Sequence, residues 1–241
     1  MPAMRLQKYL AGCGLCSRRD GEAWILAGRV NVNGTVVTKL GSTVDPHRDK
    51  VEVDGQPVRS GPPRTVLFHK PAGCLCTRKD PQGRPTIYDR LPPDLATLAY
   101  VGRLDYNTSG VLLLTSDGDL AYRLTRPEHR IPRVYVAKVS GHVKLKAVTR
   151  MTEGIEVDGQ RLAAERVHKL QDLASRTVLE ITLTEGKYRE VRRLLAAVGH
   201  EAVTLTRVEF AGLGLGNLEP GKWRPLTHGE TRRLRTLVGL Q

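Results

Sequence analysis

Hydrophobic residues near the start of the chain recur at helical spacing. Leu6, Tyr9 and Leu10 follow the i, i+3, i+4 pattern of one buried helical face. Ser17 is a good N-cap for a second helix, which Gly28 would end. The pattern therefore predicts two short helices before residue 29.

The period changes to that of strands over the next 30 residues. Two valine-rich segments, 30–32 and 35–37, flank an Asn33-Gly34 turn, which is a strong hairpin signal, and residues 51–53 alternate as another strand. Residues 59–63 (Arg-Ser-Gly-Pro-Pro) have the composition of a linker. We predict a small α/β module over residues 1–61 and a second domain over residues 65–241.

Strand patterns outnumber helical ones in the second domain. Helices are predicted at 119–125 and 187–198, and Asp158-Gly159 marks a second hairpin turn. Strands are predicted at 66–68, 99–105, 111–114, 134–139, 155–157, 178–183 and 203–208. These elements predict an α+β fold, in which a mixed, mainly antiparallel β-sheet is flanked by short helices.

The charge balance favours a polyanionic partner. The chain has 38 Lys and Arg against 25 Asp and Glu, a formal net charge of +13, which favours nucleic acid first and a membrane surface second. No stretch approaches the roughly 20 apolar residues that a membrane span needs. The N-terminus lacks a signal-peptide hydrophobic region. We expect a cytoplasmic monomer that binds no membrane.

The four cysteines stand in two close pairs, Cys13 with Cys16 and Cys74 with Cys76. In the cytosol they would stay reduced. Four thiolates could hold zinc, but the pairs lie far apart in sequence and no histidine stands at ligand spacing beside either pair. We predict structural cysteines, no metal site and no cofactor.

Two arginines stand where helix stability does not explain them. Arg18 and Arg19 fall in the first turn of the second predicted helix, and cations there oppose the helix dipole. A helix N-terminus flanked by two guanidinium groups suits a phosphate group. The alternative is a pair of solvated surface arginines.

Asp105 has the position of a catalytic group. It stands where an extended run meets a turn and a buried apolar strand, and catalytic groups often occupy such loops on rigid elements. The alternative is an aspartate that caps the following turn. The residues alone leave both interpretations open.

The helix predicted over 187–198 carries arginines on different sides of its apolar stripe. Arg192 lies at the edge of the stripe, where it can bury its stem and bring its guanidinium to a carboxylate such as Asp105. An arginine that lies along the surface is the alternative. Arg189 and Arg193 point to the opposite face, as solvent-facing phosphate contacts would.

The stretch MRLQKYLAGCGLCSRRDGEAWILAGRVNVNG resembles the small RNA-binding domain named after ribosomal protein S-four. The resemblance covers both helices, the SRR sequence and the hairpin. In that family this surface binds structured RNA. The resemblance therefore implies an RNA-binding domain and does not identify an activity.

The stretch GRLDYNTSGVLLLTSDGDLAYRL resembles the signature of RsuA/RluB-type pseudouridine synthases, R-L-D, two variable residues, T-S-G and an aliphatic run. HKPAG, RVYVAKV and LTEGKYREVRRLLAAVGHEAVTLTRV resemble three further family elements in the same order. CTRKDPQGRPTIYDRLP resembles the RluB branch, which modifies large-subunit ribosomal RNA. Glu190 stands where relatives often have glutamine.

The resemblance implies conversion of one uridine in large-subunit (23S) ribosomal RNA to pseudouridine. Asp105 aligns with the catalytic aspartate, Tyr135 with the tyrosine that stacks on the target base, and Arg192 with the arginine that pairs with the aspartate. The RNA contacts predicted from the charge pattern and the motifs are Arg18, Arg19, Lys70, Arg103, Lys187, Arg189 and Arg193.

The chemistry suits these residue types. A uridine must be flipped out of its helix before its glycosidic carbon can react, and an aromatic face can hold the flipped base. A carboxylate can attack covalently or stabilise positive charge on the sugar. Three alternatives stay open: the same reaction on small-subunit RNA, a catalytically silent RNA-binding assembly factor, and a nucleobase hydrolase that releases uracil.

Overall fold

The structure is a computed structural model that describes residues 3–59 and 61–240, so Ser60 of the predicted linker lies outside the described residues. Contacts divide the chain into two compact units. The first runs to Thr65 and includes Pro92–Ala99 and Thr115–Gly118; the second comprises Val66–Leu91, Tyr100–Leu114 and the chain from Asp119 on. The domain limits 1–61 and 65–241 stay a prediction.

The first unit contains the predicted helices and hairpin. Its elements are β1 (Met4–Arg5), α1 (Leu6–Gly12), α2 (Arg18–Leu26), β2 (Val30–Val32), β3 (Thr35–Val36), β4 (Thr43–Val44), β5 (Val51–Val53) and β6 (Gln56–Val58). Four strands form an antiparallel sheet in the order β3-β2-β5-β6, and β1 pairs with β4.

Local sequence determines the ends of these elements. Ser17 caps α2, because its hydroxyl accepts the backbone N–H of Asp20 while the Asp20 carboxylate accepts the backbone N–H of Ser17. Asn33 and Gly34 have φ of 54° and 84°, which is the left-handed pair that a tight hairpin turn requires. Leu6, Leu10 and other apolar residues of both helices and of strands β2, β4 and β5 form one buried cluster.

The second unit is built on one large mixed sheet. Its strand order is β13-β14-β10-β15-β9-β7-β17, with β16 beside β15 and β8 beside β9. The bounds are β7 (Thr65–Lys70), β8 (Ala99–Val101), β9 (Thr108–Thr115), β10 (Arg133–Ser140), β13 (Arg166–Asp172), β14 (Arg176–Leu183), β15 (Ala202–Phe210), β16 (Leu213–Gly214) and β17 (Trp223–Pro225). A separate hairpin pairs β11 (Ile155–Val157) with β12 (Gln160–Leu162).

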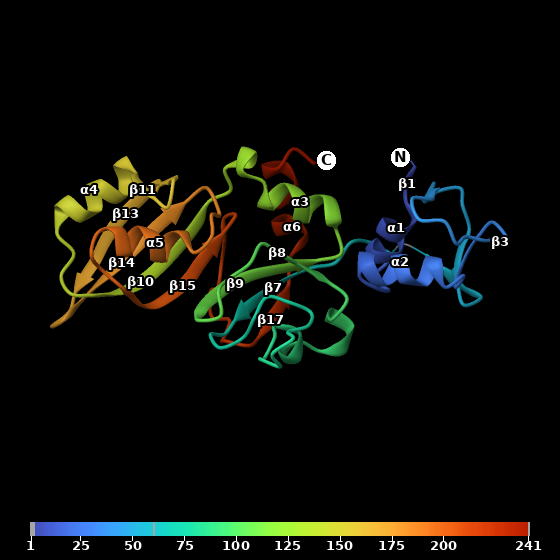
Figure 1. The fold of residues 1–241 in the computed structure, drawn as a ribbon, viewed down its shortest axis with the longest axis horizontal. Coiled ribbons are helices and arrows are strands. Elements are labelled where there is room, and N and C mark those ends of the chain that lie inside the picture. Colours follow the sequence, from blue (N-terminus) through green and yellow to red (C-terminus); the bar gives the residue numbers. More distant parts are fainter. Residues whose placement is uncertain (1–2, 60, 241) are drawn as a thin grey trace. The chain divides into compact units, whose positions relative to one another are not determined.

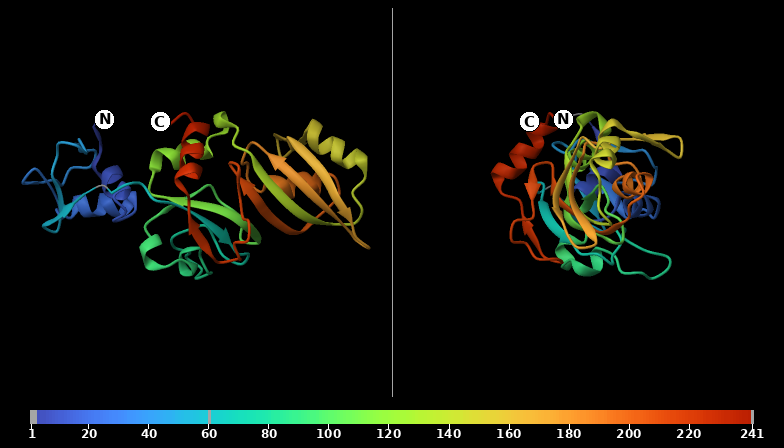
Figure 2. Two further views of the ribbon diagram at one scale, coloured as in Figure 1. Left: turned by 180° about the vertical axis from the view of Figure 1, so that it is seen from behind. Right: turned by 90° about the vertical axis from the view of Figure 1, so that its left-hand side faces the viewer.

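The helices of this unit cover the sheet in two places. α3 (Gly118–Thr125) and α6 (His228–Leu237) lie side by side in Figures 1 and 2 and share a buried apolar cluster with β7, β8 and β9. α5 (Glu190–Ala197) lies on the face of β10 and β14, and α4 (Leu145–Glu153) contacts β13. Short 3-10 turns cover Tyr88–Arg90, Pro93–Leu95 and Pro127–His129. The predicted α+β fold, with helices on a mainly antiparallel sheet, is confirmed.

Two predicted elements have different limits. The helix predicted from Lys187 begins only at Glu190, because Arg189 has a left-handed backbone with φ of 47°. The extended run predicted to Asp105 ends at Val101, because Gly102 has φ of 68° and turns the chain. Both left-handed residues lie beside the hollow described below. Within residues 3–59 and 61–240, no helix has the length and apolar character that crossing a membrane would require.

Candidate active site

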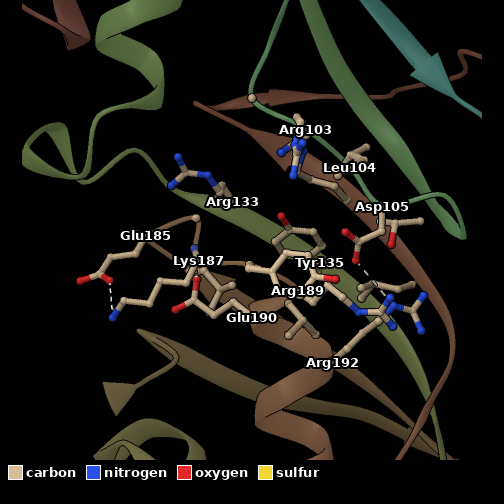
Figure 3. A pocket seen from close by; sticks show the side chains of 18 of the residues that line it. Arg103, Leu104, Asp105, Arg133, Tyr135, Glu185, Lys187, Arg189, Glu190 and Arg192 are labelled. Atoms are coloured by element: carbon tan, nitrogen blue, oxygen red, sulfur yellow. Dashed lines mark hydrogen bonds and ion pairs between the residues drawn. The ribbon is translucent and has the colours of Figure 1, made fainter. Parts of the chain in front are cut away.

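A hollow of about 290 Å³ opens in the second unit, where β10 and β15 face the loop before β9 (Figure 3). This volume is near the lower end of the roughly 300–1,000 Å³ typical of small-molecule pockets. Asp105, Tyr135 and Arg192 all line it. Six cationic side chains and three carboxylates stand in its wall: Arg103, Arg133, Lys187, Arg189, Arg192, Arg207, Asp105, Glu185 and Glu190.

Hydrogen bonds from Lys70 fix the backbone of the loop that carries Asp105. The Lys70 side chain is fully buried at the end of β7. Its ammonium donates to the carbonyl oxygens of Pro71, Asp105 and Thr108 at 3.0, 3.1 and 2.9 Å, and to that of Tyr106 at 3.4 Å. Burial lowers the pKa of Lys70, against the opposing effect of nearby thiols and Asp105. The ammonium therefore fixes the loop backbone around Asp105.

A close approach of two strands fixes the far end of the same loop. β9 runs parallel to β15, and Gly110 pairs with Arg207. Gly110 has φ of 119°, and a side-chain carbon there would overlap the backbone oxygen and nitrogen of Arg207. Only glycine allows this approach, which explains the glycine in the T-S-G sequence.

Tyr135 is presented to the hollow by β10. Its side chain is largely buried, on the same face of the strand as Arg133 and Ala137. A register shift in the pairing of β10 with β15 places Tyr135 opposite Arg207. Such irregularities re-aim side chains beside functional sites. In Figure 3 the tyrosine ring lies at the centre of the hollow, with Asp105 to one side.

Arg192 joins α5 to the Asp105 loop. Its guanidinium donates to the carbonyl oxygens of Ala202 at 3.1 Å and Asn107 at 3.3 Å. Its Nε stands 3.9 Å from Oδ2 of Asp105, and the two side chains are 17% and 34% exposed. The sequence predicts Arg192 at the edge of the apolar stripe of its helix. The structure brings its guanidinium to the Asp105 carboxylate, as Figure 3 shows.

Charged groups that the sequence analysis did not name line the inner part of the hollow. Arg133 is buried and donates to the carbonyl oxygens of Ile131 and Thr184, and burial lowers its pKa. The buried Arg207 donates from Nε to the carbonyl oxygen of Val111, at 2.8 Å. Alternation could have located both arginines, because Arg133 shares the inward face of its strand with Tyr135 and Arg207 shares that of Leu205.

Glu190 is the buried acid of the hollow. It is the first residue of α5, and its carboxylate accepts the backbone N–H of Lys187 at 3.1 Å. Burial raises the pKa of Glu190, while that hydrogen bond and the charge of Lys187 act in the opposite direction.

Two of the predicted RNA contacts have side chains that the fold itself engages. Lys70 cannot touch RNA directly, because its side chain is fully buried and its ammonium is engaged by backbone carbonyls. Arg193 is only 16% exposed, and its guanidinium donates to Gln160, Asp158 and the carbonyl oxygen of Val157. The helix periodicity did not reveal the β11–β12 hairpin that packs against this face of α5.

The other predicted contacts have accessible positions. Arg103 and Arg189 are exposed and line the hollow, whereas the ammonium of Lys187 is engaged by Glu185 and by the carbonyl oxygen of Arg161. Arg18 and Arg19 are exposed on the first turn of α2.

None of the four cysteines, all of which the structure describes, forms a disulfide. The thiol of Cys76 is buried and accepts the backbone N–H of Leu104 at 3.4 Å, so it contributes to the floor of the Asp105 loop. In the described part of the chain, no group of three or more His, Cys, Asp or Glu residues has the arrangement of a metal site.

Comparison with known proteins identifies the class of enzyme that this site belongs to. The family model described as RNA pseudouridylate synthase matches residues 64–197, and the S4 domain model matches residues 4–49. The chain is therefore an RNA-modifying enzyme with an RNA-binding module. It belongs to the RNA pseudouridylate synthase family, whose reaction is an isomerisation.

Individual relatives match almost the whole chain. A protein of Aquifex aeolicus named "Uncharacterized RNA pseudouridine synthase" is 42% identical over 100% of this chain and 97% of its own length. The "Ribosomal large subunit pseudouridine synthase B" of Bacillus subtilis is 40% identical, over 97% of this chain and 96% of that protein. A crystal structure of a pseudouridylate synthase superposes with a TM-score of 0.67 at 28% identity, covering 96% of this chain and 99% of that one.

Proposed function

We propose that this enzyme converts a flipped-out uridine of large-subunit ribosomal RNA to pseudouridine, with Asp105 as the catalytic residue. One observation carries the assignment: Asp105, Tyr135 and Arg192 come from three separate elements and line one small basic hollow. The choice of large-subunit RNA rests on the name of the Bacillus subtilis relative and on the segment at 76–92.

The hollow suits a single extruded base. A uracil ring enters between the loop of Asp105 and strand β10, and the face of Tyr135 stacks on it. Arg192, held by two backbone carbonyls, keeps a fixed positive charge beside the Asp105 carboxylate and determines its direction. Because Lys70 holds the backbone of the same loop, the carboxylate is positioned before the substrate binds.

The isomerisation balances within the nucleotide. The bond between N1 of uracil and C1′ of ribose breaks, the ring turns, and a bond between C5 and C1′ forms. C5 then loses a proton and N1 gains one, so no oxidant or reductant is needed. Three roles suit the Asp105 carboxylate: attack on the base, attack on the sugar carbon, or removal of a sugar proton.

The positive charge around the hollow suits the phosphates of the same RNA. Arg103 and Arg189 are exposed at its edge and can contact the backbone on either side of the extruded nucleotide. Arg18 and Arg19 are exposed on the first unit and are further proposed contacts with the same RNA. Their replacement by alanine is expected to weaken RNA binding and to lower its salt slope by about 1–2, while turnover on a short substrate persists. An unchanged slope would remove these arginines from the interface.

The decisive experiment maps pseudouridine directly. Ribosomal RNA from cells lacking the gene is treated with carbodiimide and read by primer extension, after complementation with the native protein, Asp105→Asn or Asp94→Asn. Asp94 is a matched control, because this exposed aspartate pairs with Arg64 and does not line the hollow. Primer extension stops at each carbodiimide-modified pseudouridine. One such stop in large-subunit RNA should be absent in the deletion strain and should return with the native and Asp94→Asn proteins only.

Other outcomes select the alternatives. Loss of a stop in small-subunit RNA would reassign the substrate, and no change anywhere would favour an assembly factor without activity. Release of free uracil from RNA by the purified protein would indicate a hydrolase. Full restoration by Asp105→Asn would reject the proposed role of the carboxylate.

A further inference from the structure

A second, shallower hollow adjoins the first. It measures about 490 Å³ and is lined by Asp158, Gln160, Tyr188, Arg189 and Arg193. Tyr188 and Arg189 line both hollows, so the two form one continuous surface. The reaction proposed above uses only the first hollow and assigns no role to Tyr188 or Gln160.

Tyr188 has the exposure of a binding residue. Its side chain is 69% exposed, although large aromatic side chains usually bury most of their surface. Arg189 directly after it has a left-handed φ of 47°, a conformation that costs a non-glycine residue free energy and persists only where the surrounding structure holds it. The loop therefore holds an aromatic ring out of the core, beside an exposed guanidinium.

The hydrogen bonds of Arg193 determine which atoms Gln160 presents. A guanidinium can only donate, so the Gln160 atom that accepts from Nη1 of Arg193, at 3.0 Å, is the oxygen Oε1. The amide nitrogen Nε2 is thereby left to donate to a ligand. The Asp158 carboxylate also pairs with Arg193, at 3.1 Å, and this pairing reduces its repulsion of a phosphate.

We propose that this second hollow binds one unpaired nucleotide adjacent to the target uridine. The base stacks on Tyr188, its phosphate contacts Arg189, and Nε2 of Gln160 donates to a carbonyl or ring nitrogen at the edge of the base. An aromatic platform beside exposed cations is how proteins hold single-stranded RNA. The inference rests on the proposed function, because continuity with the uridine hollow is what identifies RNA as the occupant.

The first test replaces the aromatic ring. The dissociation constants of overlapping transcribed fragments of large-subunit ribosomal RNA are measured for the native protein, Tyr188→Ala, Tyr188→Phe and Tyr122→Ala. Tyr122 is a matched control, because it is 56% exposed on α3 and lines neither hollow. Tyr188→Ala should raise the Kd of the tightest fragment about tenfold, while Tyr188→Phe and Tyr122→Ala should bind like the native protein.

Turnover separates this inference from the proposed function. On the fragment that the native protein modifies, Tyr188→Ala should raise KM about tenfold and leave kcat within about twofold, because Tyr188 does not touch the reacting atoms. RNA fragments with one abasic nucleotide test the contact directly. The KM difference between Tyr188→Ala and the native protein should disappear when the abasic nucleotide stands at the one neighbouring position whose base stacks on Tyr188, and it should persist at the other neighbouring positions. If the native protein binds RNA but makes no pseudouridine, the proposed function is wrong. The comparison of Kd values would still show whether Tyr188 contributes to RNA binding.

The second test removes the donor. Gln160→Glu keeps an oxygen for Arg193 and loses Nε2, so the hairpin should stay folded while RNA affinity falls about fivefold to tenfold. The loss should persist at high salt, since a mere charge repulsion would be screened. Unchanged RNA affinity in Tyr188→Ala would overturn the stacking contact. A loss of affinity in Gln160→Glu that disappears at high salt would overturn the hydrogen bond from Nε2.

Discussion

The loops at the two sides of the candidate active site are built in opposite ways. The loop that carries Asp105 is fixed by several backbone hydrogen bonds: Lys70 donates to its carbonyl oxygens, Cys76 accepts the N–H of Leu104, and Gly73 donates to the carbonyl oxygen of Tyr106. The loop of Tyr188 and Arg189 presents two exposed side chains just before α5 begins.

This difference follows the tasks proposed for the two loops. A reacting carboxylate must be held within a fraction of an ångström of its place, and buried hydrogen bonds to backbone achieve this. A surface that meets single-stranded RNA gains from exposed aromatic and cationic groups, whose contacts tolerate different bases. Rigidity is therefore concentrated where we place the chemistry, and exposure where we place recognition.

The largest effect is expected from Gly110→Ala on the fixed side. The added carbon would overlap the backbone of Arg207, and φ of 119° strains any other residue. We expect the free energy of unfolding to fall by about 3 kcal/mol or more, with loss of turnover, as measured by urea denaturation and primer extension. Gly229→Ala in α6 is the control, because its added carbon would make only an ordinary van der Waals contact with the Thr227 hydroxyl, at 4.0 Å, and should be neutral or stabilising.

A second test removes the buried ammonium under the Asp105 loop. Lys70→Met leaves the carbonyl oxygens of Pro71 and Thr108 without their donor, which should cost about 2–4 kcal/mol of stability. Turnover should fall more than affinity for RNA, because the aspartate loses its position. The exposed Lys138→Met on β10 serves as the control. Native kcat in Lys70→Met would mean that the loop keeps its shape without this lysine.

Two arginines only four residues apart allow the same comparison on the recognition side. Arg193→Ala breaks three hydrogen bonds to the β11–β12 hairpin and should lower the free energy of unfolding by about 1–3 kcal/mol. Arg189→Gly removes an exposed side chain and relieves a left-handed backbone, so it should stabilise the protein by up to about 1 kcal/mol while weakening RNA binding. Urea denaturation of the two variants checks the expectation. An Arg193→Ala protein that is more stable than Arg189→Gly would contradict the structural role of Arg193 and the exposed role of Arg189.

The sequence predicts the fold well because its signals are local. Capping by Ser17, the Asn33-Gly34 turn and the apolar strand before Thr115 each depend on neighbours in the chain, and each is present in the structure. α6 was missed even though Thr227 and Glu230 form a capping box, which the sequence contains. Apolar periodicity in α6 is weak because it buries few residues.

The candidate site was predicted less completely, because its parts depend on tertiary contacts. Motif order identified Asp105, Tyr135 and Arg192, and the structure brings them to one hollow. Periodicity could not show that Lys70 is buried under a loop 35 residues away, nor that a hairpin covers Arg193. In both cases the cation that we predicted as an RNA contact makes hydrogen bonds within the fold.

The smallest expected effect concerns Glu190, the buried acid at the start of α5. Burial raises its pKa above the ordinary value of 4.5, so its neutral form is favoured in the folded state. Its contribution to stability is complete below pH 4.5 and is lost as the pH rises through the folded-state pKa. Glu190→Gln keeps the acceptor for the Lys187 N–H and removes the titration, so it should be more stable than the native protein at pH 7.

Urea denaturation between pH 4.5 and pH 8 checks this expectation. The native protein should lose stability relative to Glu190→Gln as the pH rises, and the two curves should converge near pH 4.5. Glu156→Gln, an exposed change on β11, corrects for the altered net charge. A difference between Glu190→Gln and the native protein that is the same at every pH would mean that packing, and not the buried carboxylate, separates them. If the curves do converge, the carboxylate of Glu190, next to the loop of Tyr188 and Arg189, lowers the free energy of unfolding at neutral pH. The two loops would then differ in their effect on stability as well as in their exposure.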